Sequence, residues 1–74
     1  MQTLIVQITR TKKNYSAVVS EKINGIVIVT ANTLEELKTK VKETLHFHFD
    51  SLEEDIQEWM VKKDYELTFI LTRK

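Results

Sequence analysis

The stretch that decides the fold is residues 33–49, TLEELKTKVKETLHFHF. Thr33 and Glu36 have the spacing of a capping box, in which the threonine hydroxyl accepts the backbone N–H of Glu36 and the carboxylate reaches back to the helix start. Apolar residues then recur every three or four positions and form one stripe: Leu34, Leu37, Val41, Leu45 and Phe49. The sequence therefore predicts a capped amphipathic helix over residues 33–49.

Three apolar, β-branched segments precede this helix, and they predict strands at residues 3–10, 15–20 and 26–30. The polar turn between the first two strands has hairpin length, and Asn14 is its residue best suited to a left-handed conformation. Asn24-Gly25 is the strongest turn signal, and this single glycine is expected to supply a backbone angle that other residues resist. The third strand is apolar almost throughout, which indicates cover on both faces or one face buried by a partner chain.

The chain beyond residue 49 predicts a second helix and a fourth strand. Ser51 and Glu54 repeat the capping-box spacing, so we expect a helix over residues 51–63. Its apolar stripe comprises Leu52, Ile56, Trp59 and Met60. Residues 65–72 alternate between apolar and polar, as a strand with one covered face does. The expected order is β-β-β-α-α-β, an α+β fold in which a three-stranded antiparallel sheet carries helices on one face and gains a fourth strand.

Length and composition restrict the function. A chain of 74 residues makes one small domain, residues 1–74, whose modest core favours a homodimer or higher oligomer. There is no cysteine, which excludes disulfides and cysteine metal sites and fits a cytoplasmic location. Eleven Lys and Arg balance eleven Asp and Glu, whereas a nucleic-acid-binding module would show a basic excess. No apolar run has the length of a membrane span, and the first residues begin a strand rather than a signal peptide.

Candidate catalytic and metal-binding residues are few. Glu43, His46 and Asp50 fall within about 60° of each other on the helix, and such a triplet could bind zinc or iron. A solvated helix face explains the same spacing more simply. The first and third strands hold no acid for a two-metal nuclease, and one glycine does not make a phosphate-binding loop. We predict no catalytic residue, no cofactor and no metal ion.

The aromatic residues are the best candidates for partner contact. Phe47 lies about 140° from the apolar stripe. Either the helix ends before Phe47 and its ring folds back, or the helix continues and exposes the ring to a partner. Trp59 is expected in the core rather than in an interface, and Tyr15 is expected to pack with its hydroxyl at the surface. On geometry alone, the predicted partner-binding residues are Phe47, Tyr15 and Ile26.

Three segments together resemble the N-terminal domain of HicB-type antitoxins from type II toxin–antitoxin systems. Residues 14–19, NYSAVV, are similar to the family's G-Y-S-A-x-V strand. Residues 32–37, NTLEEL, running on to residues 45–49, LHFHF, are similar to its D-T-L-E-E-A helix start and L-E-L-Y-L-like helix end. Residues 58–69, EWMVKKDYELTF, are similar to the L-K-x-x-Y-E-I-x-F closing strand of a Bacteroidetes-like subset.

This resemblance implies a degraded ribonuclease-H-like fold that lacks the nuclease acids. It also implies a function: binding and neutralising a small HicA-type toxin, an mRNA-cleaving ribonuclease, with no direct nucleic-acid contact by this domain. Two features differ from the family. Residues 23–26, INGI, replace an L-P-G-C-like turn. Family members usually continue into a DNA-binding domain, whereas this sequence ends at Lys74, just after the fourth strand, so DNA binding is not inferred from the resemblance. The alternative interpretation is a homo-oligomerisation or ligand-sensing domain without a toxin partner; a vestigial nuclease is a third.

Overall fold

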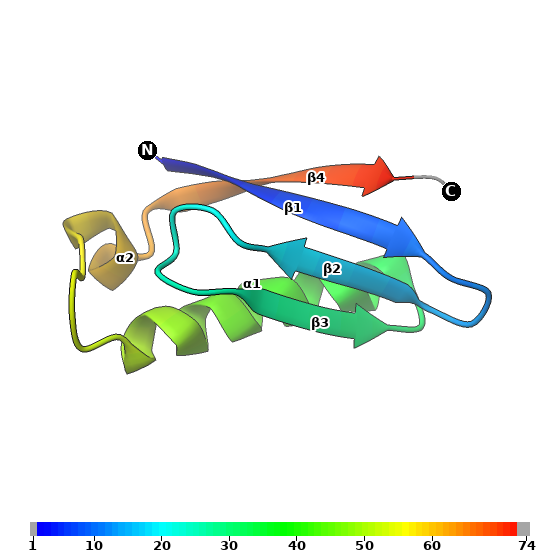
Figure 1. Cartoon of the computed structure of the whole chain (residues 1–74), viewed down its shortest axis with the longest axis horizontal. Helices are drawn as coiled ribbons and strands as arrows, with labels where there is room; N and C mark the ends of the chain where they lie inside the picture. Colours follow the sequence, from blue (N-terminus) through cyan, green and yellow to red (C-terminus); the bar gives the residue numbers. More distant parts are fainter. Residues whose placement is uncertain (1, 73–74) are drawn as a thin grey trace.

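The computed structural model describes residues 2–72 as one four-stranded sheet with two helices on the same face (Figure 1). The elements in chain order are β1 (Gln2–Arg10), β2 (Tyr15–Val19), β3 (Val27–Ala31), α1 (Leu34–Ser51), α2 (Glu58–Lys62) and β4 (Tyr65–Thr72). This β-β-β-α-α-β order confirms the predicted α+β fold. Within these residues, neither helix is long and apolar enough to cross a bilayer.

The sheet order is β3-β2-β1-β4, so β3 and β4 form its two edges. β1 and β2 form an antiparallel hairpin, and β3 adds antiparallel to β2. β4 pairs parallel to β1 from Gln2 opposite Tyr65 to Thr9 opposite Thr72. A parallel pair needs a crossover connection, and α1 with α2 provides it. The fourth strand therefore joins the far side of the first hairpin, away from β3.

The core lies between α1 and the sheet. Period-two alternation in β1 points Leu4, Val6 and Ile8 toward the helix, and each is at most 2% exposed. From α1, the predicted stripe residues Leu37, Val41, Leu45 and Phe49 are all buried, whereas Leu34 at the helix start is exposed. Every fully buried residue in the described chain is apolar.

The threonine half of the predicted capping box explains where α1 begins, whereas the Glu36 carboxylate pairs with Lys40 Nζ at 3.3 Å. Thr33 has extended backbone angles, and its Oγ1 accepts a hydrogen bond from the backbone N–H of Glu36 at 3.1 Å. The helix runs through Ser51, two residues beyond the predicted end. Leu52 then leaves the helix in an extended conformation and packs against the core.

The prediction of a helix over residues 51–63 is wrong in its first half. Ser51 does not cap a new helix: it is the last residue of α1, and its hydroxyl donates to the carbonyl of Phe47 at 2.8 Å. Since Leu52 turns inward, the three acids that follow lie in an irregular segment, and Ile56 is 41% exposed instead of lying on a buried stripe. Only residues 58–62 form the short α2, where Met60 is fully buried.

The two turns of the first three strands differ in how well they were predicted. Asn24 and Gly25 have φ of 54° and 146°, which confirms the expected turn. Asn14 is not left-handed, so that prediction is wrong. Instead, the Thr11 hydroxyl donates to the Asn14 side-chain oxygen at 2.6 Å and accepts the Asn14 backbone N–H at 3.1 Å. These side-chain bonds, with a backbone hydrogen bond from the Thr11 N–H to the Asn14 carbonyl at 2.8 Å, close the hairpin without a positive φ at Asn14.

Candidate functional site

Two of the three predicted partner residues lie at the same end of the molecule, where α1 ends. Phe47 is 74% exposed on a helix that continues past it, so the alternative in which its ring folds back is wrong. Ile26, 58% exposed, directly precedes β3. The turn and the helix touch at Gly25 and His48: His48 Nε2 donates to the carbonyl of Ile23 at 2.6 Å. Phe47 and Ile26 are each one residue from this contact.

This end of the molecule is also strongly acidic. Residues 43–61 contain six carboxylates and neither Lys nor Arg: Glu43, Asp50, Glu53, Glu54, Asp55 and Glu58. Asn24 Nδ2 donates to the carbonyl of Asp55 at 3.0 Å, which ties the turn to the segment between the helices. Lys63 and Lys62 form ion pairs with Asp50 and Glu58. We call Phe47, Ile26, Ile56 and these six acids the acidic end.

Tyr15 lies away from the acidic end. It begins β2 and pairs with Ala31, whereas Val19 pairs with Val27 at the end of β2 nearest Ile26. Its ring is half-buried against the core, with the Arg10 guanidinium 5.9 Å from the ring centroid. A single small partner surface that covers Phe47 and Ile26 would therefore not include Tyr15.

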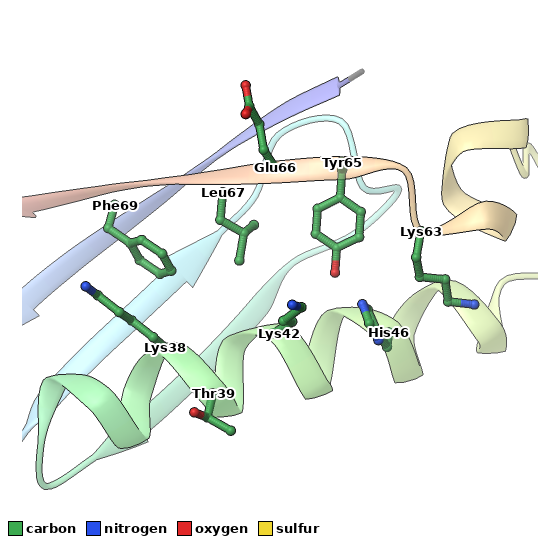
Figure 2. A pocket seen from close by; sticks show the side chains of 9 residues that line it. All are labelled: Lys38, Thr39, Lys42, His46, Lys63, Tyr65, Glu66, Leu67 and Phe69. Atoms are coloured by element: carbon green, nitrogen blue, oxygen red, sulfur yellow. The ribbon is translucent and has the colours of Figure 1, made fainter.

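A groove between α1 and β4 is the feature that the sequence analysis missed. α1 packs over β3 and β2, so it leaves the helix-facing side of β4 half-covered. The resulting groove, of about 580 Å³, has apolar side chains from β4 on one side and basic side chains from α1 on the other (Figure 2). The residues that line it are Lys38, Thr39, Lys42, His46, Lys63, Tyr65, Glu66, Leu67 and Phe69.

Tyr65 closes one end of this groove. Its ring meets His46 edge-on, with centroids 5.8 Å apart, and also contacts Phe49 and Trp59. The phenol oxygen is shielded and has no hydrogen-bond partner among residues 2–72. Burial raises the pKa of Tyr65 from 10.0 to about 12, because the phenolate would lose its hydration.

We expect Tyr65→Phe to stabilise the fold by about 1 kcal/mol, because it removes a shielded hydroxyl that makes no hydrogen bond. The raised pKa means that the folded state holds the proton more tightly, so stability falls as the pH rises from 10 to about 12. In the variant, the part of this loss of stability at alkaline pH that comes from Tyr65 should be absent. Urea unfolding at neutral and alkaline pH measures both effects; a less stable variant at neutral pH would contradict the assignment.

The uncovered face of the sheet carries a second group of exposed apolar side chains. Ile5, Ile28 and Ile70 are 42%, 60% and 46% exposed. The register places Ile28 beside Val18, Val18 beside Gln7 and Gln7 beside Ile70, so one row crosses all four strands. The expectation that β3 is covered on both faces within this chain is therefore wrong, since the helices cover only one face.

The metal-ligand triplet suggested by helix spacing does not assemble in residues 2–72. His46 turns toward Tyr65, and Asp50 pairs with Lys63, so neither is directed at a shared point with Glu43. No group of three His, Asp or Glu side chains in this part of the chain is arranged to hold a metal ion.

Comparison of the chain with protein-family models, with curated proteins and with solved structures finds no match.

Proposed function

We propose that this chain is a non-catalytic, HicB-like antitoxin module that neutralises a small HicA-type toxin in the cytoplasm by covering its RNA-cleaving surface. The observation that carries the proposal is the acidic end, where Phe47 and Ile26 are exposed and where four of the six carboxylates form no ion pair with a described Lys or Arg. A protein that cleaves RNA contacts phosphates through Lys and Arg. Exposed apolar side chains rimmed by acids complement such a surface and compete with the RNA for it.

The arrangement of the sheet supports the same proposal. A central β1 with β4 parallel to it and β2 antiparallel on its other side agrees with the ribonuclease-H-like expectation. The four strands carry only one acid, Glu66, which is exposed on the face away from α1. A nuclease of this type needs strand carboxylates that converge on metal ions, so this distribution favours binding over catalysis.

The direct test is co-expression with a small toxin encoded beside this gene, followed by co-purification and an mRNA-cleavage assay. We expect a stable complex in which cleavage stops at a fixed ratio of the two chains. Inhibition should weaken as salt is raised, because the acidic end acts partly through charge. Repeated failure to co-purify a toxin, or cleavage that continues in the presence of excess module, would refute the proposal.

Phe47→Ala is expected to weaken toxin binding by about thirtyfold or more, since a large exposed aromatic at the centre of an interface is a typical hot spot. The stability of the module itself should stay within about 0.5 kcal/mol, because the ring is 74% exposed. Ile28→Ala is the matched control: Ile28 is 60% exposed, but on the open face of the sheet. Equal effects of the two variants in calorimetric titration would place the toxin elsewhere.

The second candidate is a homo-oligomerisation domain, and the exposed row of Ile28, Val18 and Ile70 favours it. Among the described strand residues, Glu66 is the single charged side chain on this open face, so a second copy could pack against the face without burying many charges. Light scattering over a range of concentrations tests this function. A strict monomer at about 1 mM would rule out the homo-oligomerisation function, because this protein concentration exceeds the dissociation constant of even a weak specific dimer.

A further inference from the structure

We propose that the free edge of β4, together with the groove beside α1, binds an extended acidic segment of a partner protein as a fifth strand of the sheet. This site goes beyond the toxin proposal and does not depend on it. It lies on a different side of α1, since Lys42 and Phe47 are about 140° apart around the helix. Its charge is also opposite to that of the acidic end.

The two edges of the sheet differ in how they are protected. β3 is five residues long, and Lys40 Nζ from α1 donates to the backbone carbonyl of Thr30 at 3.3 Å. β4 is eight residues long, pairs only with β1, and contains one charge and no proline. Natural edge strands are usually kept from pairing by shortness, lysine cover or proline. β4 has none of these protections within the described residues, so its unpaired N–H and C=O groups are available to another strand.

Two contacts fix how α1 lies along β4. The Lys38 ammonium lies 5.1 Å from the Phe69 ring centroid, and His46 meets Tyr65 at the other end. Lys38 precedes His46 whereas Phe69 follows Tyr65, so α1 and β4 run antiparallel. Eight residues of helix rise about 12 Å and four residues of strand rise about 13 Å, so the two contacts are the same distance apart on both elements. Leu67 is midway along the strand and Lys42 midway along the helix, as Figure 2 shows. The helix side of the groove thus carries Lys38, Lys42 and His46. The strand side, which we call the apolar row, carries Phe69, Leu67 and the ring of Tyr65.

The positive charge of the groove predicts that its ligand is acidic. Lys38 and Lys42 are exposed and form no ion pair with any described carboxylate, unlike Lys40, Lys62 and Lys63. Glu66 is the only acid among the lining residues, and its carboxylate points away from α1, as Figure 2 shows. An added strand beside β4 would place every second side chain in this groove, between the apolar row and the two ammonium groups.

The spacing between Lys38 and Lys42 predicts the spacing of the carboxylates in the bound segment. Residues four apart on a helix are separated by about 6 Å along its axis, and alternate residues of a strand by about 6.6 Å. Lys38 and Lys42 therefore match two carboxylates at positions i and i+2 of an extended chain. The intervening side chain would lie on the open face of the sheet, beside Thr68 and Ile70. A peptide suits this site better than a nucleic acid, because only a peptide backbone completes the hydrogen bonds of the strand edge.

The test uses a blocked octapeptide in which Glu and Thr alternate, titrated into the isotope-labelled chain and followed by NMR. We expect the amide signals of β4 and the groove face of α1 to shift, with no shift of β3. The combined variant Lys38→Gln and Lys42→Gln should bind about tenfold more weakly, since two ion pairs are lost. The combined variant Lys12→Gln and Lys13→Gln, on the β1–β2 turn, is the matched control and should bind as tightly as the wild type.

Two altered peptides and one altered ligand separate the outcomes. A peptide with Lys in place of Glu should bind at least tenfold more weakly, and methylation of its edge-facing amides should abolish binding. Equal binding of the Glu and Lys peptides, or equal binding to both lysine variants, would overturn the proposal. Tighter binding of single-stranded RNA that is lost in the Lys38 and Lys42 variant would overturn it in favour of a nucleic acid. Self-association through β4 without peptide would overturn it in favour of a second copy.

Discussion

Leu45→Ala is expected to destabilise the fold by about 3 kcal/mol, the largest effect of any single change considered. Leu45 lies on the buried stripe of α1 and has no exposed surface. Truncation leaves a cavity between the helix and the sheet that the surrounding strands fill only in part. A domain of this size has about 3–5 kcal/mol from a single core, so the variant should retain at most about 2 kcal/mol.

Thermal unfolding followed by circular dichroism measures this loss. We expect the melting temperature to fall by about 15 °C, given the steep dependence of melting on stability in a small domain. Leu34→Ala is the matched control, because Leu34 begins the same helix but is 36% exposed. It should cost less than about 1 kcal/mol. Similar costs at the two positions would mean that the helix packs on the sheet with a different face.

Gly25→Ala is expected to cost about 2 kcal/mol through backbone strain, with a further cost from crowding. Gly25 has φ of +146°, a conformation that residues with a Cβ rarely adopt. A Cβ there would also lie 3.0 Å from His48 Cε1. Relief of this crowding would push the imidazole away from the carbonyl of Ile23 and weaken their 2.6 Å hydrogen bond.

The double variant Gly25→Ala with His48→Ala separates the two costs. Without the imidazole, the glycine substitution should retain its strain but lose its crowding, so it should cost less than in the wild type. Denaturant unfolding of the four proteins of this cycle gives the coupling energy. A coupling energy of zero would show that the imidazole moves aside freely. This contact holds Ile26 and Phe47 at the same end, so Gly25→Ala should also weaken toxin binding.

The two proposed surfaces have opposite charge although the whole chain is neutral. The six acids of the acidic end lie near the end of α1, while Lys38 and Lys42, which pair with no described carboxylate, line the groove beside β4. Net charge therefore predicts little about partners here. The local distribution favours a basic partner at the acidic end and an acidic segment at β4, and both could be bound together.

Some of the fold could be predicted because it depends on local physics. The Thr33 cap, the stripe of α1 and the alternation in β4 are short-range patterns. The structure confirms the cap, the stripe from Leu37 to Phe49 and the alternation from Tyr65 to Ile70. The helix predicted to begin at Ser51 was wrong for a tertiary reason. Its capping-box spacing was genuine, but packing of Leu52 against the core broke the helical path and left Ile56 exposed.

The sequence by itself determined the elements and their order, because these follow from backbone capping and from the periodicity of single helices and strands. It left two positions open for Phe47, and the continuation of α1 to Ser51 decided that the ring is exposed. Only the tertiary structure decided that Phe47 and Ile26 lie at the same end, that Tyr15 does not, and that the lysines of α1 face β4. These relations depend on strand order and on the side of the sheet that β4 joins. Such choices are made by packing between segments far apart in the chain, and no local pattern encodes them.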